Sequence, residues 1–178
     1  MAPPTRTSRT TWIDAGLRAL ATGGPDAVRI EPLAQQLGVT RGGFYGMIKS
    51  RRAFLDALLD TWEQRSTDDV LARVETEADD TRARVRLAGV LTFSRDLLAV
   101  DLAVRDWARR DKAVARRLRR VDDSRMDYLR AQIGAVVTDP DELEARVLLA
   151  FTLAIGRHFA SRRSEPEVVE RALDVILR

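Results

Sequence analysis

Apolar positions recur along most of the chain at helical spacing, every three or four residues, and no segment alternates as a strand does. Glycines, prolines and paired aspartates interrupt this pattern and end its segments. The pattern therefore predicts an all-α protein of about nine helices. The expected helices cover residues 10–22, 30–37, 40–47, 50–74, 81–98, 101–110, 112–134, 141–162 and 166–178.

The second and third expected helices are short and are separated by a tight turn. Gly38 ends the second helix, Val39 is an apolar residue that can fill the space between two helices, and Thr40 is a good N-cap for the third. Pairs of this kind are common packing units in all-α proteins, and they also form DNA-binding helix-turn-helix motifs. Helical spacing alone does not choose between these two interpretations.

Positive charge is concentrated near the N-terminus. Residues 1–55 carry eight Arg and Lys against three Asp and Glu, whereas residues 56–178 carry 22 against 24. A surface that binds nucleic acid needs local positive potential, because it must displace counterions from phosphates. The charge distribution thus favours DNA as a partner of the N-terminal helices, and Arg6 and Arg9 in the first segment could reach a phosphate backbone.

Residues 33–49, which read LAQQLGVTRGGFYGMIK, carry a motif that resembles the TetR family of transcriptional regulators. In that family the third helix reads as a basic residue, a glycine, a small residue, an apolar residue and a tyrosine. The chain matches this order from Arg41 to Tyr45, and the resemblance extends over about residues 8–62. Met47 departs from the family pattern, and its thioether cannot donate the hydrogen bond to a phosphate that the family residue provides.

The resemblance implies a three-helix, helix-turn-helix DNA-binding domain over residues 1–55 and a larger helical domain over residues 56–178 for ligand binding and dimerisation. It further implies a homodimer that binds a palindromic, double-stranded operator and is released by a small-molecule effector, most often as a repressor. In this interpretation Arg41 reads bases, paired glycines allow close approach to DNA, and Phe44 faces the core. The expected DNA contacts are Arg29, Thr40, Arg41, Gly42, Gly43, Tyr45 and Lys49.

Two segments near the C-terminus, residues 147–155 and 168–177, are apolar around most of the helix and must be covered. They are either buried within one subunit or, as the resemblance implies, paired with their copies in a four-helix dimer interface. Large side chains in the preceding helices are core residues in most proteins, but some could instead line an effector pocket. The candidates for such a pocket are Phe93, Trp107, Met126 and Tyr128.

Few residues suggest catalysis. The chain has no cysteine and a single histidine, His158, to which no role is assigned, and the basic run at residues 116–120 is followed by aspartates, as in a solvated, ion-paired face. We therefore expect no catalytic residue, metal site or cofactor. The absence of a long apolar segment favours a cytoplasmic protein without membrane contact.

Two alternatives to a ligand-responsive regulator stay open. The first is an all-α enzyme whose N-terminal helices only resemble those of a DNA-binding protein. The second is a DNA-binding protein whose C-terminal domain contacts a protein partner and no ligand.

Overall fold

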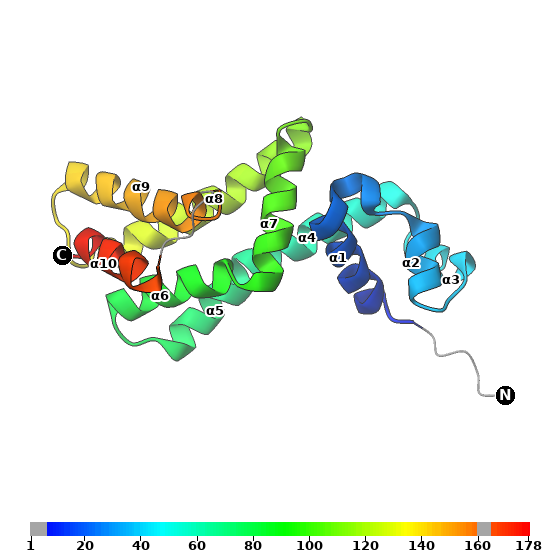
Figure 1. Ribbon diagram of the computed structural model, residues 1–178, viewed down its shortest axis with the longest axis horizontal. Coiled ribbons are helices and arrows are strands. Elements are labelled where there is room, and N and C mark those ends of the chain that lie inside the picture. Colours follow the sequence, from blue (N-terminus) through cyan, green and yellow to red (C-terminus); the bar gives the residue numbers. More distant parts are fainter. Residues whose placement is uncertain (1–6, 160–164) are drawn as a thin grey trace. The chain divides into compact units, whose positions relative to one another are not determined.

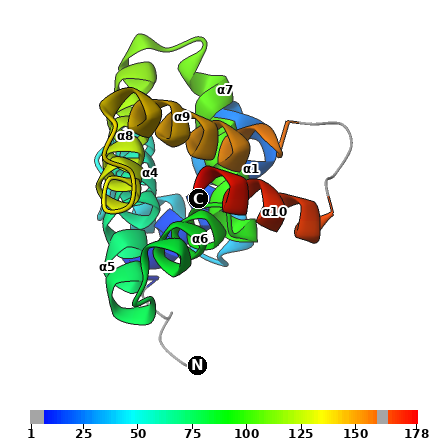
Figure 2. The ribbon, with the colours of Figure 1, turned by 90° about the vertical axis from the view of Figure 1, so that its left-hand side faces the viewer.

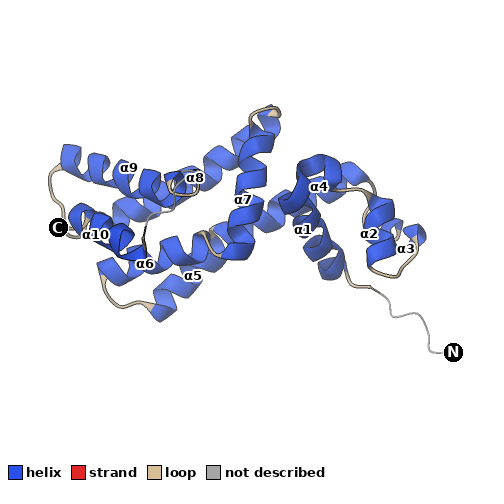
Figure 3. Cartoon of the chain, viewed as in Figure 1, coloured by secondary structure: helices blue, strands red, loops and turns tan. Residues whose placement is uncertain are grey.

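The computed structural model describes residues 7–159 and 165–178, and this part of the chain consists of helices and their connections, without strands (Figure 1, Figure 3). The predicted all-α class is therefore confirmed. The described residues form ten helices, one more than expected. They are α1 (Arg9–Ala27), α2 (Ile30–Gln36), α3 (Arg41–Tyr45), α4 (Arg51–Ser66), α5 (Asp68–Glu77), α6 (Thr81–Thr92), α7 (Arg95–Ala108), α8 (Lys112–Ile133), α9 (Pro140–Gly156) and α10 (Pro166–Ile176).

The additional helix arises from a break at Thr67. The prediction of one helix over residues 50–74 is wrong, because α4 ends at Ser66 and α5 begins at Asp68. The backbone of Thr67 has φ −125° and ψ −81°, outside the helical region. Asp68 and Asp69 then occupy the first turn of α5, where the helix dipole favours carboxylates.

The predicted break between residues 98 and 101 is also wrong. α6 ends at Thr92, and α7 runs without interruption from Arg95 to Ala108. Asp101 lies in the middle of α7 with its carboxylate buried, and Arg105 one turn later donates a hydrogen bond of 2.7 Å to it. Because this pairing stabilises a carboxylate inside a helix, the chain need not break there.

The chain forms two compact units. The N-terminal unit comprises Met1–Arg65 and Arg95–Leu118, and the C-terminal unit comprises Ser66–Ser94 and Arg119–Arg178. Helices α4 and α8 contribute residues to both. These units are defined by packing, so the expected functional boundary after residue 55 stays a prediction.

Large aromatic and aliphatic side chains from α1, α3 and α4 build the core of the N-terminal unit. Trp12, Phe44, Phe54 and Leu58 are fully buried in it. Gly16 lets α1 and α4 approach closely, since a Cβ atom there would lie 2.6 Å from Phe54 Cζ and 2.8 Å from Leu58 Cδ2. The closely packed helices α1 and α4 therefore form a fixed support for α3.

The last helices of the C-terminal unit share an apolar core. Ile133 of α8, Val147 of α9 and Ile176 of α10 are buried together in this cluster, and α9 and α10 lie beside each other (Figure 2). In the described part of the chain, no helix combines the length and apolar character needed to cross a membrane.

Candidate nucleic-acid interface and ligand cavity

Helix α3 is fastened to the N-terminal unit by one aromatic side chain. The ring of Phe44 is fully buried, with its centroid 5.1 Å from that of Trp12 and 5.2 Å from that of Phe54, both in edge-to-face geometry. Because these rings come from α1 and α4, the inner side of α3 is held from two directions. The expectation that Phe44 faces the core is confirmed.

The outer side of α3 is open to solvent. Arg41, Gly42 and Gly43 are exposed, and Tyr45 is 47% exposed. A Cβ atom at Gly43 would meet nothing within 4 Å, and one at Gly42 would meet only Thr40 Oγ1 at 3.7 Å. Neither glycine has a positive φ. The fold thus does not require glycine at either position, and the surface they form is one that another molecule could approach closely.

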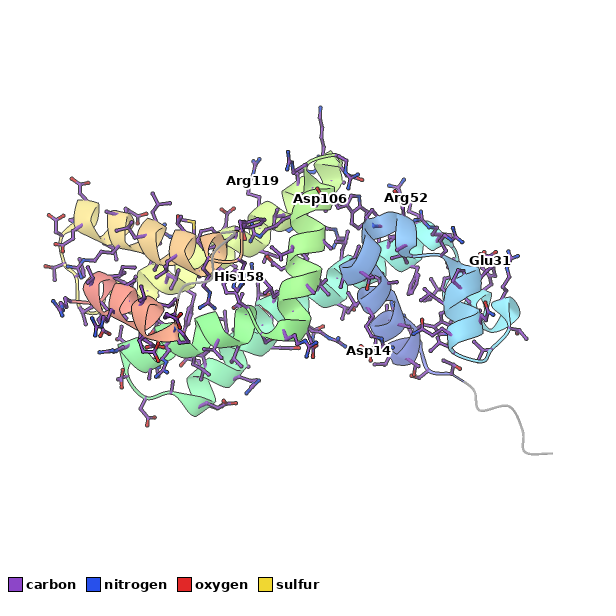
Figure 4. The ribbon with its side chains drawn as sticks, viewed as in Figure 1. Asp14, Glu31, Arg52, Asp106, Arg119 and His158 are labelled. Atoms are coloured by element: carbon purple, nitrogen blue, oxygen red, sulfur yellow. The ribbon has the colours of Figure 1, made fainter. Side chains whose placement is uncertain are left out.

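Arg41 is held in the free protein by a carboxylate of the preceding helix. Its Nη1 lies 3.0 Å from Oε1 of Glu31, and both side chains are 59% exposed. Glu31 lies on α2 (Figure 4). An exposed ion pair of this kind contributes little to stability, so it can be exchanged for other contacts at low cost. The ion pair therefore orients the guanidinium of Arg41 at the surface, and the fold does not depend on it.

The turn between α2 and α3 requires glycine. Gly38 has a φ of +66°, in the left-handed region where side chains are unfavourable. The following amide, that of Val39, donates to the carbonyl of Ala34 over 3.0 Å. This pattern ends α2 and sets the direction of α3.

Two residues precede these short helices without capping them through their side chains. Thr40 occupies the N-cap position of α3, as expected, and has the extended backbone of that position, but its hydroxyl makes no capping hydrogen bond. Arg29 stands in the same position before α2 and likewise makes no capping bond. Both residues are exposed.

Two basic residues at the start of α4 differ in their surroundings. Lys49 is exposed, and the hydroxyl of Ser50 accepts from the amide of Ala53 over 3.1 Å and caps the helix. Arg51 donates from Nε to the carbonyl of Val28 over 2.9 Å and from Nη2 to the carbonyl of Pro25. Sequence reasoning did not identify this structural role of Arg51, because its partners are more than twenty residues away.

Of the first basic residues, Arg9 begins α1 and is exposed, whereas Arg6 lies outside the described residues. In the basic run on α8, Arg117 is ion-paired, but with acids of α4 and not with the aspartates that follow it on α8. Nη1 of Arg117 contacts Asp60 Oδ1 at 2.6 Å and Glu63 Oε1 at 2.8 Å, both on α4 within the N-terminal unit.

A separate cavity of about 120 Å³ lies within the C-terminal unit. Of the four candidates for an effector pocket, Phe93 and Tyr128 line it, whereas Trp107 and Met126 do not. Met126 packs against the cluster around Ile133, and Trp107 lies on α7 in the N-terminal unit. Aromatic and methionine residues at helical spacing do not by themselves distinguish a pocket from a core, so the sequence could not separate these cases.

Polar residues of the cavity carried no sequence signal. Ser66, the last residue of α4, lines the cavity and is 1% exposed. Arg125 of α8 also lines it, and its guanidinium carbon lies 5.8 Å from the centroid of the Phe93 ring. The ring of His158, which follows α9 (Figure 4), has its centroid 5.2 Å from that of Phe93, with the two ring planes tilted by 34°.

Among the described residues, no three His, Cys, Asp or Glu side chains gather in a manner that could hold a metal ion.

Comparison with known proteins shows the fold. No protein-family model matches the sequence, and none of the curated proteins matches it. A transcriptional regulator from Rhodococcus sp. superposes with a TM-score of 0.72 at 20% identity, over 96% of this chain and 94% of its own. A transcriptional regulator of the TetR/AcrR family from Thermobifida fusca does so with a TM-score of 0.65 at 18% identity, over 96% of each chain.

A third solved structure is described as a transcriptional regulator from Saccharomonospora viridis in complex with choline. It superposes with a TM-score of 0.74 at 17% identity, over 95% of this chain and 94% of its own. These likenesses cover nearly the whole of each protein. The chain therefore has the all-α fold of the TetR-type regulators.

Proposed function

We propose that this chain, which has the fold of the TetR-type regulators, binds operator DNA through α3 as a homodimer and represses transcription until a small effector releases it. One observation carries the proposal. The outer side of α3 offers Arg41, two glycines and Tyr45 to solvent, while Phe44 fixes its inner side to the core. A recognition helix needs this division, because it must be rigidly held and yet reach into the major groove.

Each exposed residue has a role that its chemistry supports. Arg41 exchanges Glu31 for the edge of a guanine, to which a guanidinium donates two hydrogen bonds. Gly42 and Gly43 let the backbone approach the DNA. The remaining contacts position the helix on phosphates and come from Arg29, Thr40, Tyr45 and Lys49.

Exposed apolar side chains on α9 and α10 support dimerisation through these helices. Leu148 and Leu149 of α9 and Val168 and Val175 of α10 are each more than half exposed. Apolar groups gathered on two neighbouring helices are the usual mark of a protein interface. A second copy of the chain would cover them and hold two recognition helices about 34 Å apart, as a palindromic site requires.

The cavity supports control by an effector. Its lining includes Ser66, and α4 runs from this residue back through Phe54 and Trp62 without glycine or proline. A helix of this composition is stiff, so a ligand that displaces its end is expected to shift its start. The structural relative from S. viridis holds choline, which supports a small molecule as the kind of effector.

The experiment begins with DNA selected by the wild-type chain from random duplexes, because the operator is unknown. We expect Arg41→Ala to lose at least about tenfold in affinity for the selected sequence, with little change for unrelated DNA. Lys49→Ala should weaken binding to the selected sequence and to unrelated DNA alike. The number of counterions released on binding, which the salt dependence of the affinity reports, should fall by about one. Fluorescence anisotropy at several salt concentrations measures these quantities.

A matched control removes a charge elsewhere. Arg73 is exposed on α5 and pairs with Glu77, so Arg73→Ala should bind the selected DNA as the wild type does. Equal losses in Arg41→Ala and Arg73→Ala would contradict the proposed interface. So would failure of the wild-type chain to select any sequence, which would favour the enzyme alternative.

A further inference from the structure

We infer that the cavity of the C-terminal unit accepts a small organic monocarboxylate whose apolar body lies on Phe93 and whose carboxylate meets Arg125 and the hydroxyls of Ser66 and Tyr128. This inference rests on the proposed function, since it names the chemical class of the effector. It follows from the size, the polar atoms and the charge of the cavity.

The volume and the apolar lining of the cavity indicate the size and the character of the ligand's apolar part. The cavity volume of about 120 Å³ is comparable with that of a cavity of roughly 150 Å³ known to hold benzene. Apolar residues from several helices make up most of the walls. They include Val70, Val85, Phe93, Leu129, Ala154 and Leu173. Such a space suits a single aromatic ring or a short alkyl chain.

Two hydroxyls at the cavity make no hydrogen bond to any of the residues that the structure describes. The Oγ of Ser66 and the OH of Tyr128 are both buried and both lack a partner, and both residues line the cavity. Buried hydroxyls without partners are costly, so each is explained by a ligand that accepts from it. Burial raises the pKa of Tyr128, and nearby Glu75 raises it further against an opposing effect of Arg84, so its phenol keeps its proton at neutral pH and can donate it.

The charged residues of the lining favour an anion. Three arginines stand against one acid, Glu170, whose Oε1 already lies 2.9 Å from Nε of Arg86. The side chain of Arg125 is 9% exposed, against 59% for that of Arg86, and its Nη1 lies 3.5 Å from Asp122 Oδ1. Among the charged side chains of the lining, positive ones therefore outnumber negative ones, which favours a carboxylate over an ammonium group as the ligand.

The test uses the full chain and six probes in two matched sets, benzoate, benzamide and benzylamine, and hexanoate, hexanamide and hexylamine. Isothermal titration calorimetry gives the affinities, and thermal unfolding gives an independent readout. We expect the carboxylate of at least one set to bind about tenfold or more tightly than its amide and its amine. Binding that is equal for the amide, stronger for the amine, or absent for all six probes would overturn the inference.

Variants locate the binding. Arg125→Gln should abolish the preference for carboxylate over amide, whereas Arg73→Gln, which removes a charge outside the lining, should retain it. Tyr128→Phe and Ser66→Ala remove only a hydroxyl that has no hydrogen-bond partner among the described residues, so both variants should fold normally. Each should weaken carboxylate binding about three- to tenfold, and they decide the question even if Arg125→Gln does not fold.

The experiments distinguish an error in the inferred ligand class from an error in the proposed DNA-binding function. The probes are titrated without DNA, and the DNA selection is performed without probes. A chain that selects DNA but prefers no carboxylate overturns only the ligand class, whereas one that binds carboxylate but selects no DNA overturns the regulator.

Discussion

Four glycines of the N-terminal unit differ in what a methyl group would encounter at each position. At Gly16 it would collide with side chains of α4, and at Gly38 the left-handed backbone would be strained. At Gly43 it would enter open space, and at Gly42 it would make only an ordinary contact with Thr40 Oγ1. Glycine within a helix is less favourable than alanine, so Gly42 and Gly43 lower the stability of the fold, and no packing contact within the N-terminal unit requires them.

We expect Gly42→Ala and Gly43→Ala each to raise the free energy of unfolding by about 0.5 to 1 kcal/mol. In the same variants the added methyl group meets the DNA, and affinity for the selected duplex should fall. Chemical denaturation and fluorescence anisotropy measure the two changes. A variant that gains stability and keeps full affinity would show that the backbone of α3 does not approach DNA closely.

Helices that depend on local signals were predictable from sequence, whereas those that depend on remote partners were not. The short helices around Gly38 follow from a turn that the sequence displays directly. The break at Thr67 was missed because apolar residues continue at helical spacing on both sides, through Val70 and Val74. The continuation of α7 through Asp101 depends on a buried ion pair with Arg105 that spacing does not reveal.

The functional residues divide in the same way. The motif from Arg41 to Tyr45 is continuous in sequence, so its exposed and buried members could be named in advance. The cavity gathers Ser66, Arg125 and their neighbours from several helices, and no local pattern marks them.

The packing of α1 on α4 yields a prediction at the scale of elements. Gly16→Ala should lower the free energy of unfolding by about 1 to 3 kcal/mol, because Phe54 and Leu58 must move to accommodate the methyl group. Gly89→Ala on α6, where a Cβ atom meets nothing within 4 Å, is the matched control and should be neutral or slightly stabilising. Equal stability of both variants in urea denaturation would show that α1 and α4 are not tightly packed.

At the scale of the whole molecule, the proposed dimer explains apolar surface that one chain leaves in solvent. Leu149 and Val175 are 57% and 65% exposed on α9 and α10. Two recognition helices held together in one dimer would bind a two-fold symmetric DNA site far more tightly than either helix alone. Dimerisation and operator binding should therefore be lost together.

We expect Leu149→Glu to convert the chain to a folded monomer, because a carboxylate cannot be buried unpaired in the interface. Its affinity for the selected duplex should fall by about a hundredfold or more. Val136 is 55% exposed outside both helices, so Val136→Glu is the control and should stay dimeric. Light scattering after size-exclusion chromatography measures the mass, and an unchanged dimer for Leu149→Glu would place the interface elsewhere.

The open space at Gly42 and Gly43 also bears on how such a chain would diverge over time. Packing within the described residues leaves room for a Cβ atom at either site, so the proposed DNA partner is what would favour glycine there. Descendants that keep the fold but no longer bind DNA should therefore gain larger residues at Gly42 and Gly43 early, whereas Gly16 and Gly38 should stay glycine.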